Sequence, residues 1–347
     1  MTRGVRLVSV VAALCVQLAN CAPDVPTFKL NNGKEMPAIA LGTYLGFDQN
    51  GIVKPQDKQV VKVVEHAIDV GYRHFDTASV YSTEEQLGEG VRNKIEEGKV
   101  IREDLFITTK LWNTHHKREQ VAEALRESLK QLSLNYVDLY LMHWPIGLNE
   151  DYSNSDVDFM ETWRGLEDMQ RLGLAKSIGL SNFNQEQLER VIKECSIKPA
   201  VLQIEVHPQI IQSDLVSYAQ SQGIVVMGYS PFGSLVSRFG VPPGSGPSID
   251  DPTLVEIAKK HGKTTPQVVL RWLVDRDIVP VPKTVNLKRL EENIDIFDFK
   301  LDKDEIEKIN KYDKQIRYTL PSFWQNHPYY PFEKIENPLP NPFEKKA

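Results

Sequence analysis

The sequence predicts an α/β fold, a (β/α)8 TIM barrel that is preceded by a β-hairpin and carries long loops at its C-terminal face. Eight short apolar runs alternate with stretches of helical periodicity, and several of these runs are almost continuously apolar, as expected for strands covered on both faces. An open doubly wound sheet is the alternative. That fold usually carries G-x-G-x-x-G after its first strand, and this sequence lacks the motif.

The expected elements follow one another regularly along the chain. The segment 27–43 holds two short apolar runs around Asn32-Gly33, a pair typical of two-residue hairpin turns. We expect the eight barrel strands at 37–43, 74–78, 105–111, 137–144, 175–182, 201–207, 224–232 and 278–283. Amphipathic helices are expected between them, for example at 57–70, 118–132, 159–173, 184–195 and 214–223.

Two segments interrupt this alternation. Residues 233–250 are rich in Gly, Pro and Ser, which predicts a long surface loop of the kind that usually serves a function. Residues 318–347 are dense in Pro and aromatic residues. This segment is too aromatic for a solvated linker, so we expect at least its first half to pack on the barrel.

Composition excludes several classes of function. The chain has 347 residues, 41% of them hydrophobic and 25% charged, which is typical of a soluble globular protein with a large core. The net charge of −6 and the lack of basic runs interleaved with aromatics disfavour a nucleic-acid surface. The acids and histidines show no metal-ligand spacing, so no metal is expected. No Gly-x-Ser-x-Gly elbow occurs and Cys195 lies in a helical stretch, which disfavours hydrolysis by a Ser or Cys nucleophile.

The N-terminus has the layout of a secretory signal peptide. Arg3 and Arg6 precede an apolar run that ends in small residues near Cys21, so we expect a signal peptide at 1–21 and a single mature domain at 22–347. A membrane anchor is the alternative, but the run is too short to span a bilayer comfortably. A bacterial lipoprotein box at 18–21 is a third interpretation, disfavoured by its asparagine. We therefore expect an exported, extracellular protein without a membrane segment, whose mature chain keeps only Cys195 and so has no internal disulfide.

The ends of the predicted strands carry polar and aromatic side chains. In a barrel of this type the active site is built at the C-terminal ends of the strands. Each side chain alone has a simpler explanation, as a helix cap, a core histidine or packing, but eight consecutive strands share the pattern. The residues at these ends are Thr43, Tyr44, Asp76, Tyr81, Lys110, Trp112, His143, Trp144, Ser181, Asn182, Gln203, Glu205, Tyr229, Ser230 and Lys283.

A tyrosine, a lysine and an aspartate among these residues can form a proton donor. The free phenol titrates near ~10, and a neighbouring ammonium lowers that pKa by stabilising the phenolate. We expect Lys110 to act on Tyr81 in this way, with Asp76 holding the ammonium in place. His143 can orient a substrate carbonyl beside them.

Several long motifs resemble the aldo-keto reductases. "GYRHFDTASVYSTEEQLGEGVR" (71–92), "YVDLYLMHWP" (136–145) and "VPKTVNLKRLEEN" (281–293) are similar to the three signature regions of that family. "GLAKSIGLSNFN", "QIEVHP" and "GYSPFGS" fit in the same order, so that the resemblance extends from about residue 27 to about residue 335. The resemblance implies an NADPH-dependent carbonyl reductase on a (β/α)8 barrel.

The resemblance also implies roles for individual residues. It makes Tyr81 the proton donor, with Lys110, Asp76 and His143 as its catalytic partners. From their aromatic character we also expect Tyr44, Trp112, Trp144 and the aromatic segment 318–347 to line an apolar substrate pocket. The residues that it assigns to NADPH are Thr43, Ser181, Asn182, Gln203, Tyr229, Ser230, Lys283, Thr284, Arg289 and Asn293.

The sequence departs from the family pattern at two loops. Val236 stands where close relatives have an aspartate that helps to hold a loop over the cofactor, and the loop 146–159 is short for the family. The N-terminal signal, "GTYLG" and "HPYYPFEK" are similar to secreted insect reductases that act on 3-dehydroecdysteroids. We therefore expect a small-molecule carbonyl substrate, an ecdysteroid, and a monomeric enzyme. The alternatives are a broad-specificity aldehyde and ketone reductase, or a protein that binds NADPH without turnover.

Overall fold

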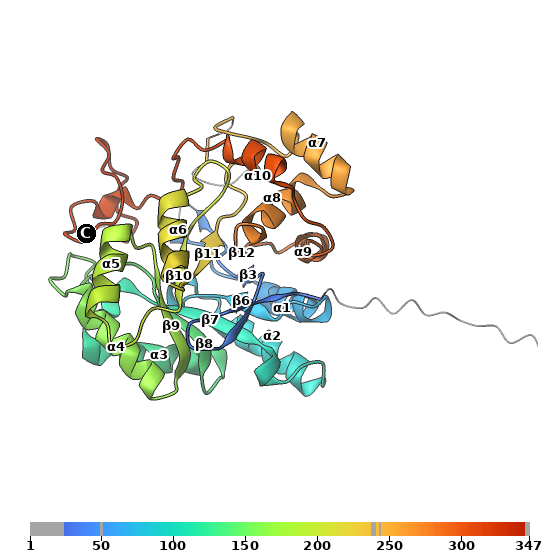
Figure 1. Ribbon diagram of the computed structural model, residues 1–347. Helices are drawn as coiled ribbons and strands as arrows, with labels where there is room; N and C mark the ends of the chain where they lie inside the picture. The colour runs from blue at the N-terminus through green and yellow to red at the C-terminus, as the bar shows by residue number, and fades with distance from the viewer. Residues whose placement is uncertain (1–23, 49–50, 237–240, 243, 344–347) are drawn as a thin grey trace, which may run out of the picture.

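The computed structural model describes residues 24–48, 51–236, 241–242 and 244–343. The expected signal peptide at 1–21, and the cleavage point after it, lie outside the described residues. Eight parallel strands form the centre of the molecule and helices surround them (Figure 1). The order of these strands is β3 (Leu41–Gly42), β6 (His74–Asp76), β7 (Phe106–Leu111), β8 (Val137–Met142), β9 (Ala175–Ser181), β10 (Val201–Glu205), β11 (Val225–Tyr229) and β12 (Ile278–Val281).

Backbone hydrogen bonds join the first and last strands of this sheet. Ala40 N donates to Pro280 O over 3.0 Å, and Gly42 N donates to Pro282 O over 2.9 Å. These bonds close the sheet into a barrel and confirm the predicted (β/α)8 fold. The first strand is shorter than expected, because Pro37 pairs with Thr27 in the N-terminal hairpin instead of with the barrel.

The N-terminal hairpin forms, but its turn differs from the expected two-residue turn. Strands β1 (Thr27–Lys29) and β2 (Glu35–Pro37) pair antiparallel, and Lys29 opposite Glu35 leaves a five-residue connection between them. Only Gly33 takes a positive φ in this connection, at 82°. Gly33 N donates to Leu30 O over 2.9 Å, so Asn31 and Asn32 occupy the centre of a turn, and the Asn32 side-chain amide donates to Ser177 Oγ, which ties the hairpin to the barrel.

Amphipathic helices cover the outside of the barrel. In α1, for example, Val60, Val64 and Ile68 are buried on one face. The chain begins α5 with a capping box, in which Asn184 Oδ1 accepts from Gln187 N and Gln187 Oε1 accepts from Asn184 N. The helices are α1 (Gln59–Asp69), α2 (Glu84–Glu96), α3 (Arg118–Leu132), α4 (Phe159–Arg171), α5 (Gln185–Glu194), α6 (Ser213–Ser221), α7 (Pro252–His261), α8 (Thr265–Val274), α9 (Leu287–Ile294) and α10 (Lys303–Asn310).

Helices α2 and α3 approach closely because α2 carries a glycine at the contact. A Cβ added at Gly88 would lie 2.2 Å from the carbonyl oxygen of Leu132. Any larger residue would push the two helices apart. This matters for the site, because α2 follows Tyr81 directly in the chain.

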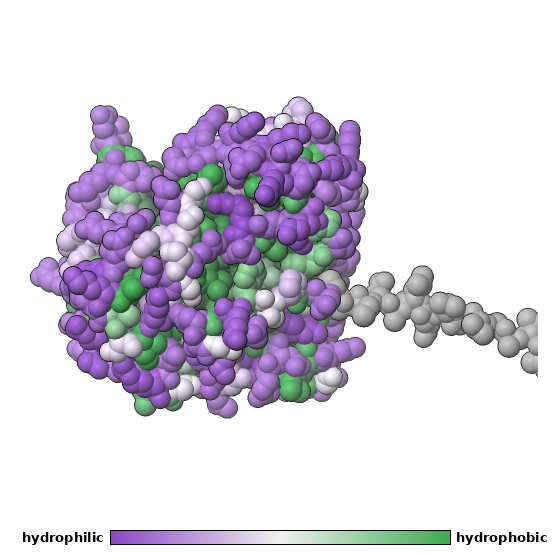
Figure 2. Space-filling view, in the orientation of Figure 1, coloured by the Kyte–Doolittle hydropathy of each residue, from purple (hydrophilic) through white to green (hydrophobic). Residues whose placement is uncertain are grey.

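The C-terminal segment packs on the barrel, as its aromatic content predicts. In Figure 1 it runs beside α5, and Trp324 at its centre is only 3% exposed. Residues 233–236, 241–242 and 244–250 form turns without helix or strand, as the Gly, Pro and Ser content predicts. Hydrophilic residues cover most of the face drawn in Figure 2. No helix within the described residues is long and apolar enough to cross a membrane.

Candidate active site

A buried ion pair lies at the C-terminal ends of β6 and β7. Lys110 Nζ donates to Asp76 Oδ1 over 2.6 Å and to the carbonyl oxygen of Thr77 over 2.8 Å. The Lys110 side chain is 0% exposed and that of Asp76 is 5% exposed. Gln203 on β10 donates from Nε2 to Asp76 Oδ2 over 2.7 Å. Both carboxylate oxygens are therefore satisfied, as a buried charge requires.

Tyr81 and His143 meet directly above this pair. The short 3-10 helix η1 (Ser79–Tyr81) follows β6 and places the Tyr81 hydroxyl 3.4 Å from His143 Nε2. Lys110 Nζ lies 5.0 Å from the centre of the Tyr81 ring. The four residues assigned to catalysis by the sequence thus form one cluster, contributed by the ends of three strands and one short helix.

Burial sets the protonation states in this cluster. It raises the pKa of Tyr81 well above its ordinary value, and Asp76 raises it further. The sequence predicts a net lowering of the Tyr81 pKa by the Lys110 ammonium, but the net direction is upward, since desolvation of the phenolate outweighs the stabilisation by that ammonium. Burial also lowers the pKa of His143 well below its ordinary value, so its imidazole is neutral at pH 7. Tyr81 keeps its proton, as a proton donor must.

The neighbouring strand ends carry a second polar group. Asn182 follows the last residue of β9 and has a positive φ of 61°, and its Nδ2 donates to the carbonyl oxygen of His143 over 3.0 Å and to Ser181 Oγ over 3.2 Å. Tyr229 at the end of β11 donates to Asn182 Oδ1 over 2.7 Å. Ser230 follows with a positive φ of 53°. Ser181, Asn182 and Tyr229 therefore form one hydrogen-bonded group next to His143.

Thr43 and Tyr44 close the other side of the cluster. Thr43 Oγ1 lies 3.2 Å from the carbonyl oxygen of Asp76 and 2.9 Å from Thr83 Oγ1. The Tyr44 ring lies 4.9 Å from the Tyr81 ring, measured between centroids. The residues after β3 therefore contact the proton donor and its aspartate directly.

Lys283, Thr284, Arg289 and Asn293 form a separate group after β12. Within the part of the chain that the structure describes, neither Lys283 nor Arg289 has an ion-pair partner, and burial lowers the pKa of Lys283. Asn286 caps α9 between them by accepting from Arg289 N over 3.2 Å. Two free cations at a helix N-terminus are suited to a phosphate.

Aromatic rings line the approach to His143. Trp112 lies 5.3 Å and Trp144 lies 6.3 Å from the His143 ring. The C-terminal segment adds Trp324, 5.9 Å from Trp112, and Phe343, 5.5 Å from Trp112. The aromatic content of residues 318–347 predicted that this segment would line the substrate pocket. That content did not single out Trp324 and Phe343 as the rings that reach Trp112.

Sequence analysis missed one buried acid near the cluster. Glu84, in the first turn of α2, accepts from Thr109 Oγ1 over 2.6 Å and is 5% exposed. Burial raises its pKa. A carboxylate in the first turn of a helix is usual on any surface helix, so no signal distinguished it. Because Thr109 precedes Lys110 on β7, this bond helps to fix the strand that carries the catalytic lysine.

The described residues contain no group of three or more His, Cys, Asp or Glu side chains that could hold a metal ion.

The sequence model of the Aldo/keto reductase family matches residues 38–314, which is most of the chain. The chain belongs to the aldo-keto reductase family. Its membership identifies it as an NADP-dependent oxidoreductase acting on aldehydes or ketones.

Close relatives of this reductase align over nearly their whole length. It is 48% identical to aldo-keto reductase AKR2E4 of Bombyx mori over 314 residues, which cover 89% of this chain and 99% of that protein. It is 39% identical to aldo-keto reductase family 1 member A1 of Mus musculus over 324 residues, covering 87% and 97%. The relatives therefore match the whole barrel and not only its motifs.

Solved structures agree with the barrel. The crystal structure of AKR2E4 of Bombyx mori in complex with NADP superposes on this reductase with a TM-score of 0.84 and 47% identity, covering 90% of this chain and 100% of that one. Aldo-keto reductase AKR2E5 of the same silkworm, complexed with NADPH, gives a TM-score of 0.89 and 42% identity, covering 93% and 98%. Both relatives were thus solved with the nicotinamide cofactor that the signature motifs imply.

Proposed function

We propose that this aldo-keto reductase reduces the carbonyl group of a bulky apolar ketone with NADPH, and that its substrate is 3-dehydroecdysone, which it converts to ecdysone. The observation that carries the reductase proposal is the contact between Tyr81 and His143 above the Lys110–Asp76 pair. A protein that only bound the cofactor would have no physical need for a buried ion pair beneath a protonated tyrosine.

The residues of the cluster have complementary tasks. When bound, the nicotinamide supplies the hydride that adds to the carbonyl carbon. The Tyr81 hydroxyl gives its proton to the carbonyl oxygen, which completes the alcohol. The neutral His143 imidazole, 3.4 Å from that hydroxyl, orients the same oxygen. Lys110 stabilises the phenolate that remains on Tyr81, and Asp76 keeps the ammonium charged despite its burial.

The free cations after β12 fit the 2′-phosphate of NADPH. We expect Lys283→Met and Arg289→Met each to weaken NADPH binding about 10- to 100-fold, because each removes a charge-assisted hydrogen bond. Binding of NADH, which lacks that phosphate, should change less than about 3-fold. Fluorescence titration with each cofactor measures this, with Lys308→Met on α10 as the control. Equal losses for NADPH and NADH would contradict the assignment.

The described end of the loop, at Ser245 and Gly246, is held by contacts that do not involve Val236. Tyr318 donates to Gln209 Oε1 over 2.7 Å, Gln209 Nε2 donates to Ser245 O over 2.7 Å, and Ser245 Oγ lies 2.9 Å from the Tyr318 hydroxyl. A Cβ added at Gly246 would lie 2.1 Å from Gln209 Nε2, so the loop backbone also approaches closely. Tyr318 thus ties this loop to the C-terminal segment.

We expect Tyr318→Phe to raise the dissociation rate of NADPH about 5-fold, because a neutral hydrogen bond contributes about 1 kcal/mol. We propose that this loop lies over the bound cofactor, so that loosening it speeds release. Stopped-flow displacement of bound NADPH measures the rate. Tyr136→Phe, remote from the loop, serves as the control. An unchanged rate in Tyr318→Phe would show that the loop is not held over the cofactor by these bonds.

The aromatic approach supports a bulky substrate. The indole N–H groups of Trp112 and Trp324 are buried and have no hydrogen-bond partner among the described residues. An unsatisfied buried donor is costly, so these two groups favour a ligand that brings acceptor oxygens. A polyhydroxylated steroid ketone offers both a large apolar surface for the rings and such oxygens. The similarity of the N-terminal signal and C-terminal motifs to insect ecdysteroid reductases points to the same substrate.

Phe343 covers this approach. Its ring stacks on Trp324 at a centroid distance of 5.8 Å and on Tyr152 at 5.2 Å, so a large substrate has to displace it. We expect Phe343→Ala to lower KM for 3-dehydroecdysone about 3- to 10-fold, because a ring contact of about 0.5–1.5 kcal/mol no longer opposes entry. KM for benzaldehyde should stay the same. Steady-state kinetics with both substrates test this, and a rise in KM for the steroid would instead make Phe343 part of its binding site.

Comparison of two substrates tests the proposed function. Purified protein is mixed with NADPH and either 3-dehydroecdysone or benzaldehyde, and loss of cofactor absorbance is followed. A much larger kcat/KM for the steroid supports the ecdysteroid proposal. If the aldehyde is reduced equally well, the protein is a broad-specificity reductase. If NADPH binds and neither substrate is reduced, the protein is a catalytically silent binding protein.

We also propose that the chain is exported as a monomer, after removal of residues 1–21. The support is the charged start, apolar run and small-residue exit of the N-terminal sequence. Expression of the full chain in insect cells tests this. The medium should contain a protein whose N-terminal sequence begins at Ala22 and whose mass by light scattering is that of one chain. Intact protein retained in the cells would contradict export.

A further inference from the structure

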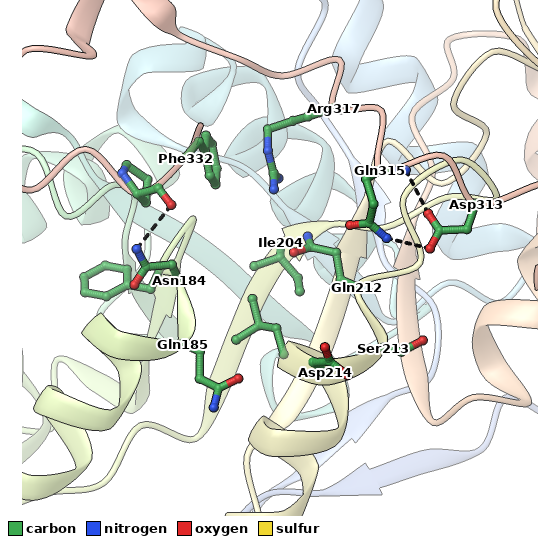
Figure 3. A pocket seen from close by; sticks show the side chains of 13 residues that line it. Asn184, Gln185, Ile204, Gln212, Ser213, Asp214, Asp313, Gln315, Arg317 and Phe332 are labelled. Atoms are coloured by element: carbon green, nitrogen blue, oxygen red, sulfur yellow. Dashed lines mark hydrogen bonds between the residues drawn. The ribbon is translucent and has the colours of Figure 1, made fainter. Parts of the chain in front are cut away.

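A second cavity lies apart from the catalytic cluster. It has a volume of about 310 Å³ and is enclosed by the N-terminal ends of α5 and α6 and by the C-terminal segment (Figure 3). None of the residues assigned above to catalysis, to the cofactor or to the substrate lines it. Its apolar walls come from Phe183, Ile204 and Leu215.

Arg317 lines the cavity, and its Nε lies within ion-pair distance of Glu333 but beyond hydrogen-bond distance. Its side chain is 10% exposed, and its Nε has no hydrogen-bond partner within the part of the chain that the structure describes. Figure 3 shows the guanidinium directed from the C-terminal segment toward the space between Phe332 and Gln212. The Phe332 ring covers one face of the guanidinium at 3.8 Å. Among the described residues its one ion-pair contact is Glu333, at 3.6 Å, and that carboxylate is 54% exposed.

The N-terminus of α6 opens onto the same space. The preceding residue, Gln212, has a left-handed conformation and makes no side-chain cap. Its side-chain amide is used elsewhere, because Nε2 donates to the carbonyl oxygen of Glu205 over 2.7 Å. The first N–H groups of α6 therefore lack a side-chain acceptor, and the helix dipole adds positive potential there. A buried guanidinium and an uncapped helix end thus converge on one cavity.

Charges at the rim restrict the kind of anion. Asp214 and Asp313 both line the cavity, and Asp313 accepts from Gln315 Nε2 over 2.6 Å. Together with Glu333 they oppose a multiply charged ion such as phosphate. A single carboxylate can replace the 3.6 Å contact of Arg317 with the exposed Glu333, and an apolar body suits the walls. We propose that this cavity binds a small organic monocarboxylate, with its carboxylate paired to Arg317 and its apolar part against Phe183, Ile204 and Leu215.

Crystallography with a labelled probe locates such a ligand. The probe is 4-bromobenzoate, added to crystals of the full chain saturated with NADP⁺, and its bromine is found by anomalous scattering. The expected result is a bromine peak inside the cavity with the carboxylate on Arg317. Calorimetry of the same mixture should show saturable binding that Arg317→Met weakens at least about 10-fold, the loss expected for one charge-assisted pair. Inorganic phosphate should not compete.

Two further variants separate the site from general effects. Arg190→Met is the matched control, since Arg190 also stacks on a phenylalanine, 4.8 Å from the Phe159 ring, but lies outside the cavity. It should bind the probe as the unaltered protein does. Gln185→Trp changes an exposed rim residue, keeps Arg317 and should block binding by filling the cavity. A bromine peak only near Tyr81, or binding unchanged in both Arg317→Met and Gln185→Trp, would overturn the proposal.

Discussion

Replacement of Lys110 by methionine is expected to lower the free energy of unfolding by about 3–5 kcal/mol, because it leaves a buried carboxylate without its cation. Asp76 would keep only the bond from Gln203 Nε2 and those at its own backbone. The side chain of methionine fills a similar volume, so packing alone predicts a much smaller loss. Urea unfolding of the two proteins measures the difference.

A second substitution distinguishes the charge effect from a packing effect. In Lys110→Met with Asp76→Asn the carboxylate is removed as well, and we expect most of the lost stability to return. Activity should remain absent in both variants, because the phenolate of Tyr81 has no ammonium beside it. Lys130→Met is the control, since Lys130 is 78% exposed and its partner Glu127 is 56% exposed, and exposed pairs contribute less than about 1 kcal/mol. If the double variant is no more stable than Lys110→Met, the ion pair does not account for the loss.

Tyr81→Phe is expected to lower kcat by about 10²–10⁴-fold, the usual contribution of a positioned proton donor. The dissociation constant for NADPH should not change, since the substitution removes one hydroxyl and keeps the ring beside Tyr44. In the unaltered enzyme the protonated tyrosine is the active form, and its pKa is raised well above its ordinary value. The chemical step should therefore be independent of pH from about 6 to 9 and slow only as pH rises through that higher pKa.

Single-turnover rates across this pH range check the assignment. A step that already slows near neutral pH would mean that Lys110 overcomes burial and lowers the Tyr81 pKa, as the sequence alone suggested. A Tyr81→Phe variant with unchanged kcat would mean that another group, or water, supplies the proton. Measuring NADPH affinity of the same preparation excludes misfolding as the cause of a lost rate.

The barrel could be predicted because its strands are covered on both faces. Nearly continuous apolar runs such as β11 and β12 mark buried parallel strands, and polar side chains at the strand ends mark the face where the site forms. The same logic placed Asp76, Lys110 and His143 near one another. The apolar pattern could not predict the turn of the N-terminal hairpin. The Asn32 side chain there donates to Ser177 Oγ, which lies 145 residues away in the sequence. Such a contact depends on the finished fold.

Burial and long-range contacts also explain what the sequence did not reveal at the site. Charge alone favours a lowered Tyr81 pKa, but desolvation is a property of the packed site and reverses the direction. Glu84 and Arg317 look like ordinary surface residues in the sequence, and only the fold buries them. Trp324 and Phe343 belong to a segment without secondary-structure periodicity, so nothing local fixed which of its rings would reach Trp112.

The most direct test of the central claim is a single-turnover experiment with enzyme-bound NADPH and excess 3-dehydroecdysone. We predict that the bound cofactor is oxidised in one exponential phase and that one ecdysone forms per enzyme. Tyr81→Phe, mixed in the same way, should slow that phase at least about 100-fold. Cofactor that stays reduced in the unaltered enzyme, with this substrate and with benzaldehyde, would contradict the claim that this chain is a carbonyl reductase.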